Sequence, residues 1–150
     1  MSRTSIRSAT DGDAESIAQL SGTLGYSATA DVMRERLHAI LGSSSDLLIV
    51  AVDSNDHVLG WLEAHAANVI ESGFRVEIMG LIVAPEQRRS GIGRLLVYEA
   101  ERWASLLSAN AIVVRSNVQR TESHAFYPAL GYTLTKTQNV YRKTLANTHS

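Results

Sequence analysis

The chain has 150 residues, of which 45% are hydrophobic and 19% charged, and its formal net charge is −1. These values indicate one globular domain with a sizeable core, and they give no general electrostatic attraction to nucleic acid or to an anionic membrane. No apolar run is long enough to cross a bilayer, and the polar residues 1–10 lack a signal-peptide core, so we expect a cytoplasmic protein. The absence of cysteine excludes disulfides, thiolate metal sites and a cysteine acyl-enzyme.

Strands and helices are expected to alternate along the chain. In order, the pattern predicts a strand at 5–9, a helix after the cap residues 10–13, a helix at 30–41, strands at 47–52, 58–67 and 75–83, a long helix at 91–108, a strand at 111–115, a short helix at 121–130 and a final hairpin of strands at 132–137 and 140–144. This order is typical of an α/β domain with a mixed sheet, antiparallel early and parallel in the middle. The polar tail from about residue 146 is expected to fray.

The most informative segment follows the strand that ends near Val83. A proline and a basic turn lead to two glycines one residue apart, and a helix pattern then begins. Glycines let backbone N–H groups approach a ligand closely, and a helix start adds unpaired N–H donors and a positive dipole end. The segment therefore predicts an anion site suited to phosphates, to which Arg88, Arg89 and Arg94 add positive charge.

Three phosphate-binding motifs compete for this segment. A P-loop is excluded because the chain has no Gly-Lys pair. A dinucleotide fingerprint requires a small residue where Leu96 stands and an acid near the end of the next strand, where residues 111–116 carry none. The third motif fits, because Arg88-x-x-Gly91-x-Gly93 resembles the acyl-CoA pyrophosphate loop of the GNAT N-acetyltransferase superfamily.

Two further segments carry the same resemblance. The run from Asn117 to Tyr132, with Phe126-Tyr127-x-x-x-Gly131-Tyr132, is similar to the closing motif of the family, and Ile6-Arg7-x-Ala9-Thr10 is similar to its opening. The resemblance covers nearly the whole chain. It implies a single GNAT domain over residues 1–150, with about seven strands and about four helices, and with a splay between the fourth and fifth strands.

The resemblance also implies how acetyl-CoA is held. Backbone groups of Leu81, Ile82 and Val83 would pair with the pantetheine arm, as an added strand pairs with an open sheet edge. The pyrophosphate would lie on the loop formed by Arg88, Arg89, Ser90, Gly91, Ile92, Gly93 and Arg94. Asn117 and Arg120 are candidates for the pantetheine or 3′-phosphate side.

Acetyl transfer requires a neutral amine, a stabilised carbonyl oxygen and a proton for the leaving thiolate. The resemblance implies Tyr127 as the acid, Glu77 as the base and the backbone N–H of Leu81 or Ile82 for the oxygen. Each side chain also has a structural alternative: Tyr127 as a core aromatic beside Phe126, and Glu77 as a strand charge paired with Arg75 or a cross-strand residue.

The acceptor side is less defined. Glu63 and His65 share one face of a strand and are candidates to line the acceptor pocket, together with Tyr26 and His124. The five scattered histidines show no metal-binding spacing, and we expect no metal.

The sequence thus predicts an N-acetyltransferase that moves the acetyl group from acetyl-CoA to a primary amine of a small molecule or peptide, by direct attack in a ternary complex. Two alternatives stay open: a regulatory GNAT module that binds CoA without turnover, and a nucleotide-binding domain that uses the same glycine loop. The family resemblance further implies a homodimer.

Overall fold

The computed structural model describes residues 3–23, 28–115 and 121–146, and the side chains of 121–124 are not among the described parts. The chain divides into two compact units, Met1–Arg115 and Ser116–Ser150. The prediction of a single domain stays a prediction. Among the described residues, no helix has the length and apolar character that crossing a bilayer requires.

The first unit carries all the strands of the described chain. Its elements are β1 (Ser5–Ser8), η1 (Asp11–Asp13), α1 (Ala14–Gly22), α2 (Ala30–Leu41), β2 (Asp46–Val52), β3 (Val58–Val69), β4 (Gly73–Val83), η2 (Pro85–Gln87), α3 (Ile92–Leu106) and β5 (Ala111–Val114). The second unit contains α4 (Thr121–Ala129).

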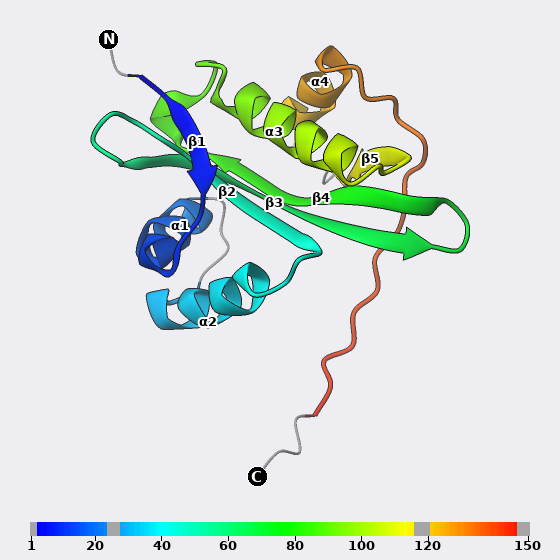
Figure 1. The fold of residues 1–150 in the computed structure, drawn as a ribbon, viewed down its shortest axis with the longest axis horizontal. Helices are drawn as coiled ribbons and strands as arrows, with labels where there is room; N and C mark the ends of the chain where they lie inside the picture. The colour runs from blue at the N-terminus through cyan, green and yellow to red at the C-terminus, as the bar shows by residue number, and fades with distance from the viewer. Residues whose placement is uncertain (1–2, 24–27, 116–120, 147–150) are drawn as a thin grey trace. The chain divides into compact units, whose positions relative to one another are not determined.

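The sheet has the order β1-β2-β3-β4-β5. Pairing is antiparallel from β1 to β4, and β4 pairs with β5 in parallel. The helices α1 and α2 cover one face and α3 covers the other (Figure 1). These observations confirm the predicted α/β class with a mixed sheet.

Alternation along the strands supplies each face with its own core. On the face of α1 and α2, one cluster gathers Ala9, Ile17, Leu37, Leu48, Val50 and Val52, with Trp61 packed against it. The stripe of α3 that faces the sheet is buried and consists of Ile92, Leu96, Val97, Ala100 and Ala104. Each layer therefore fixes one face of β3, whose residues 60–66 alternate between buried and half-buried.

In the second unit, α4 ends in a recognisable C-terminal capping motif. Gly131 has φ +94°, its N–H donates to the carbonyl of Pro128 at 3.0 Å, and the N–H of Tyr132 donates to the carbonyl of Tyr127 at 3.1 Å. This pair of bonds is the Schellman motif, which favours glycine at the left-handed position. The prediction that Gly131 ends this helix is confirmed.

The predicted final hairpin is wrong. Residues 132–146 form no strand, so the described sheet has five strands rather than about seven. Leu134, Val140 and Tyr141 have exposed fractions of 83%, 84% and 90%. Alternating apolar residues indicate an extended chain, but they do not indicate which strand it pairs with. A two-stranded hairpin that joins no wider sheet is only marginally stable in water.

Gly60 lies where α3 meets the sheet. A Cβ at this position would come within 2.9 Å of the carbonyl oxygen of Ile82 and 3.4 Å of side-chain atoms of Ile92 and Leu96. Because β3 has no side chain at Gly60, the first turn of α3 lies close to the sheet, and the loop before α3 is held close to the sheet with it.

We expect Gly60→Ala to lower the free energy of unfolding by about 1–3 kcal/mol, because the obstructing atom is backbone and cannot rotate away. Urea denaturation measures the change. Gly22→Ala is the matched control, because nothing lies within 4 Å of an added Cβ at the end of α1. Equal effects of the two substitutions would contradict the close contact.

Candidate active site

An irregularity in β4 divides the strand into two parts. Glu63 pairs with Gly80 and Ala64 pairs with Ile78, so Met79 is an extra residue that faces no partner on β3. Pairing of β4 with β5 covers only Arg75–Ile78 and ends directly before Met79. A bulge of this kind bends and twists its strand. Within the described residues, β4 beyond Ile78 pairs only with β3, where the resemblance expects the splay.

The backbone beyond the bulge is open on one side. The N–H of Ala84 donates to the carbonyl of Leu59 at 2.8 Å, so Ala84 faces β3. Because backbone groups alternate in direction along an antiparallel pair, Ile82 also faces β3, whereas Leu81 and Val83 direct their N–H and C=O groups toward the open edge. Of the two donors predicted for the carbonyl oxygen, this geometry favours Leu81.

The loop after β4 is built for close approach to its backbone. Arg89 has φ +67° and Gly91 has φ +86°, which turns the chain sharply into α3. The hydroxyl of Ser90 donates to the carbonyl of Gln87 and braces the turn. An added Cβ at Gly91 would meet nothing within 4 Å, so the space before the helix is clear.

The N-terminus of α3 is left without a cap. Gly91 provides no side-chain cap, and the first turn of the helix carries no acidic residue. The first helical bond runs from the N–H of Leu95 to the carbonyl of Gly91 at 3.1 Å, so the N–H groups of Ile92, Gly93 and Arg94 have no partner within the helix. These donors and the helix dipole favour an anion at this point.

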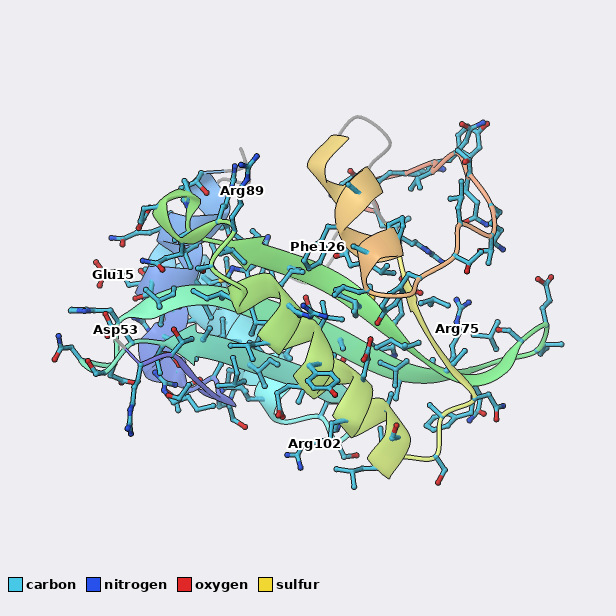
Figure 2. All side chains as sticks on the ribbon, turned by 90° about the horizontal axis from the view of Figure 1, so that it is seen from above. Glu15, Asp53, Arg75, Arg89, Arg102 and Phe126 are labelled. Carbon is cyan, nitrogen blue, oxygen red and sulfur yellow. The ribbon has the colours of Figure 1, made fainter. Side chains whose placement is uncertain are left out.

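The positive charge predicted for this loop is in place. Arg88, Arg89 and Arg94 are exposed, and no carboxylate pairs with any of them in the described part of the chain. Arg89 lies in the turn before α3, at the opposite end of the helix from Arg102 (Figure 2). A phosphate at the start of α3 would therefore meet both backbone donors and free guanidinium groups.

Four ionisable side chains form a row on the face of the sheet that carries α1 and α2; we call Asp46, Glu63, His65 and Glu77 the polar row. His65 stands between Asp46 on β2 and Glu77 on β4 in the strand register. Its Nδ1 lies 2.7 Å from Oδ1 of Asp46. Glu63 shares this face, two residues along β3 from His65.

Glu77 is engaged by two guanidinium groups. Its carboxylate lies 3.4 Å from Nη2 of Arg75 and 3.5 Å from Nε of Arg115, and its side chain is 14% exposed. From the sequence, Glu77 has two alternative roles, as a base or as an ion-paired strand charge. Both contacts correspond to the second alternative. The assignment of Glu77 as the base stays a prediction.

Glu63 has a different environment. No hydrogen bond or ion pair engages its half-buried carboxylate within the described residues. Burial raises the pKa of Glu63 above its ordinary value, the nearby negative charge of Asp46 raises it further, and the nearby His65 offsets part of this rise. The side chain thus holds a proton more readily than an exposed glutamate does.

Trp61 and Gly80 shape the surface beside Glu63. A Cβ at Gly80 would come within 2.9 Å of two atoms of the Trp61 ring, so the ring lies against the backbone of β4 just beyond the bulge. The indole N–H of Trp61 is buried and has no hydrogen-bond partner among the described residues. Trp61 therefore packs against β4 at the position where the bulge begins.

Tyr127 lies in the second unit, and its ring contacts are with residues of that unit. Its ring packs edge-on against Phe126, with centroids 4.9 Å apart, and against Tyr132, with centroids 5.8 Å apart. These contacts fix the ring within α4 and the turn that follows. Its role as the acid stays a prediction.

Some predicted site residues lie outside the described parts. These are Tyr26, Asn117 and Arg120, together with the side chain of His124. Conversely, sequence reasoning missed Asp46, whose only signal is its position directly before an apolar strand. In the described residues no group of His, Asp or Glu side chains is arranged to hold a metal ion.

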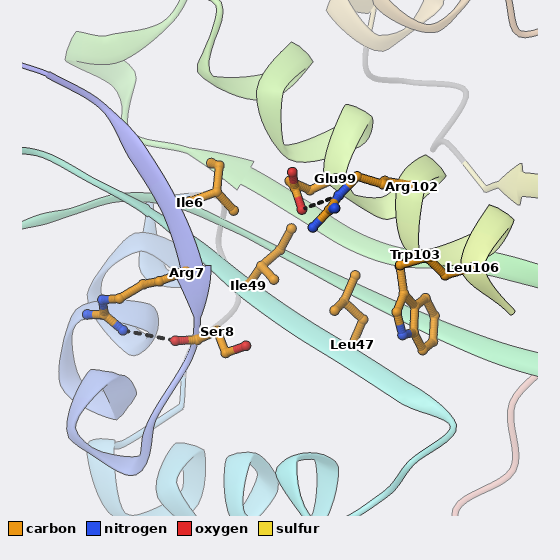
Figure 3. A pocket seen from close by; sticks show the side chains of 9 residues that line it. All are labelled: Ile6, Arg7, Ser8, Leu47, Ile49, Glu99, Arg102, Trp103 and Leu106. Atoms are coloured by element: carbon orange, nitrogen blue, oxygen red, sulfur yellow. Dashed lines mark hydrogen bonds and ion pairs between the residues drawn. The ribbon is translucent and has the colours of Figure 1, made fainter.

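A hollow of about 280 Å³ lies on the opposite face of the sheet, between β1, β2 and the second half of α3 (Figure 3). Its lining residues are Ile6, Arg7, Ser8, Leu47, Ile49, Glu99, Arg102, Trp103 and Leu106. None of the predicted site residues is among them, so the hollow is separate from the loop and from the polar row.

Comparison with known proteins gives a family match and curated relatives. The model of the Acetyltransferase (GNAT) family matches residues 15–132. An aminoglycoside N(6')-acetyltransferase type 1 from Stenotrophomonas maltophilia is 26% identical over 144 residues, which cover 93% of each chain.

Solved structures show the same fold. Aminoglycoside N-acetyltransferase AAC(6')-Iy in complex with CoA has a TM-score of 0.85 and 20% identity, over 95% of this chain and 96% of that chain. A transcriptional regulator from Bacillus halodurans has a TM-score of 0.85 and 23% identity, over 94% of this chain and all of that chain. At these identities the structural similarity establishes the fold, and the chemistry has to be argued from the residues of the site.

The environment of Glu63 predicts a pH-dependent stability. Because its pKa is raised in the folded state, the contribution of Glu63 to stability is lost as pH rises above the ordinary glutamate pKa of about 4.3. We therefore expect Glu63→Gln to raise the Tm at pH 7.5, and we expect the gain to vanish below about pH 4. Thermal unfolding across this range measures it.

Glu77→Gln is the matched control for this measurement. It removes a carboxylate from the same face, but one that is held by two arginines, so we expect a lower Tm at pH 7.5. A lower Tm for Glu63→Gln as well would show that the Glu63 carboxylate has a stabilising partner when ionised.

Proposed function

This chain belongs to the GNAT acetyltransferase family, and from that premise we propose that the acceptor is a primary amine on a small molecule with more than one positive charge. The chain is an acetyl-CoA-dependent N-acetyltransferase of a small-molecule amine, as its relatives are. The single observation that carries the proposed acceptor is the polar row, because the carboxylates of Asp46 and Glu63, which contact no arginine among the described residues, lie there on one face of the sheet. The curated relatives act on aminoglycosides, which are amines of this class.

Acetyl-CoA supplies the activated acetyl group, and the residues of the first unit fit its parts. The uncapped start of α3 offers backbone donors and three free arginines to the pyrophosphate. Leu81 and Val83 offer backbone groups at the open edge to the amide-rich pantetheine arm. We propose that the N–H of Leu81 also stabilises the developing negative charge on the carbonyl oxygen.

The acceptor approaches on the face of the polar row under this proposal. Its nitrogen attacks directly, since no cysteine is present to form an acyl-enzyme. We propose that the Tyr127 hydroxyl donates a proton to the leaving sulfur. A homodimer, which the resemblance implies, and a cytoplasmic location, which the polar N-terminus predicts, complete the proposal as predictions.

The loop assignment is tested by two substitutions at one position. Gly91→Asp places a negative charge in the space before α3, whereas Gly91→Asn places a neutral side chain of the same size there and tolerates the positive φ. We expect the aspartate variant to weaken CoA binding at least about tenfold more than the asparagine variant, because the charge repels the pyrophosphate. Isothermal titration with CoA measures both; equal affinities would remove the phosphate from this loop.

The function itself is tested by binding followed by turnover. We expect acetyl-CoA and CoA, but not ATP or NAD, to raise the Tm. We then expect thiol release to be fastest with neamine or spermidine in a panel that also contains glucosamine and a peptide with a free N-terminus. Faster turnover of the singly charged amines would contradict the proposed acceptor class.

Tyr127→Phe separates the enzyme from a regulatory module. We expect this variant to keep the affinity for CoA and to lose turnover. If the wild-type protein binds CoA and releases no thiol with any amine of the panel, the regulatory alternative replaces the enzyme.

A further inference from the structure

We propose that Glu63 is the catalytic base, which accepts a proton from the acceptor ammonium group, and that Glu77 is instead an ion-paired charge of the sheet. The inference rests on the acetyl-transfer function proposed above and deepens it. It departs from the family resemblance, which implies Glu77 as the base, and from the sequence analysis, in which Glu63 is a candidate for the lining of the acceptor pocket.

Position along the strands favours Glu63. It pairs with Gly80, directly beyond the bulge, while Glu77 lies on the far side of the bulge beside β5. Leu81, whose N–H faces the open edge, pairs with Leu62. Glu63 is therefore one residue along β3 from Leu62, the partner of Leu81, which is a rise of about 3.3 Å. His65, the partner of Glu77, is three residues from Leu62, which is about 10 Å.

Availability also favours Glu63. A general base must be able to contact the proton that it removes. The carboxylate of Glu77 is divided between Arg75 and Arg115. Among the described residues Glu63 has no hydrogen bond or ion pair, although the charges of Asp46 and His65 act on it from nearby. The Trp61 ring lies against Gly80 on the same face as Glu63, so an apolar surface adjoins the Glu63 carboxylate.

The charged neighbours of Glu63 are known on each adjoining strand. Asp46 on β2, His65 on β3 and Glu77 on β4 share its face, and the two arginines that hold Glu77 flank them. The ionisable side chains of α1 and α2 (Glu15, Asp31, Arg34, Glu35, Arg36 and His38) are exposed to solvent. Burial and Asp46 raise the pKa of Glu63 and the nearby His65 lowers it, with a net rise that moves its titration toward the working pH of a base.

The step balances in atoms and charge. One proton of the ammonium group moves to the Glu63 carboxylate and afterwards to solvent. The freed nitrogen forms a bond to the acetyl carbonyl carbon, and the carbon–sulfur bond breaks. The nitrogen loses a second proton to solvent while the sulfur gains one, which gives an amide, the CoA thiol and one net proton.

The decisive experiment compares Glu63→Gln with Glu77→Gln. Steady-state rates are measured against pH with the amine of the panel that wild-type protein acetylates fastest. For Glu63→Gln we expect kcat to fall at least about 100-fold and the acidic limb of the pH–rate profile to disappear, with the KM for acetyl-CoA unchanged. For Glu77→Gln we expect a smaller loss of kcat and a retained acidic limb.

Two kinetic results would overturn the assignment. One is a Glu63→Gln variant with kcat within about threefold of wild type and the same acidic limb; the other is an increase in the KM for the amine alone, which indicates cation binding without proton transfer. Glu63 is half-buried and unpaired, so the variant is expected to fold, and its Tm checks this.

A second measurement needs no acceptor. The carboxyl carbon of Glu63 is followed by ¹³C NMR as pH changes in the free wild-type protein, and Glu63→Gln identifies its resonance. We expect a midpoint above the ordinary value of about 4.3, and a midpoint at or below that value would overturn the proposal. Failure of the acetyl-transfer function appears separately, as the absence of any Tm increase with acetyl-CoA.

Discussion

The bulge at Met79 is the constraint on which the site depends. One extra residue in β4 coincides with the end of pairing to β5 and with the place where Trp61 rests on Gly80. Before the bulge, β4 is an interior strand with partners on both sides. Beyond it, Leu81 and Val83 keep one set of backbone groups unpaired by any described strand, and backbone groups of this kind can recognise an amide-bearing ligand without any particular side chain.

The start of α3 completes this constraint. The open edge of β4 runs directly into the loop that ends at the uncapped helix, so one continuous stretch offers hydrogen bonds first to amides and then to phosphates. The rest of the fold keeps these two parts together. Gly60 lets α3 approach β3, and the stripe from Ile92 to Ala104 buries the helix against the sheet.

Local patterns in the sequence predicted much of this arrangement. The α2 bounds follow from helical spacing, and the loop conformation follows from glycine and from the break at Pro85, because these are properties of short segments. Register was not predictable in the same way. Neither the pairing of Asp46 with His65 nor the extra residue at Met79 leaves a local signal, since both depend on how separate strands align. The prediction of a final hairpin was wrong for the same reason: Leu134 and Val140 alternate with polar residues, but residues 132–146 form no strand in the described part of the chain.

The strand β3 serves two layers at once. Leu62 and Ala64 lie under α3, while Trp61, Glu63 and His65 face the other side, where α1 and α2 pack. Because the side-chain period of a strand is two, inserting or deleting a single residue in β3 would exchange these faces, placing carboxylate and imidazole in the core under α3 and leucine on the polar surface. A one-residue insertion or deletion in β3 that no bulge absorbed would therefore be more damaging than a substitution at any one of its positions.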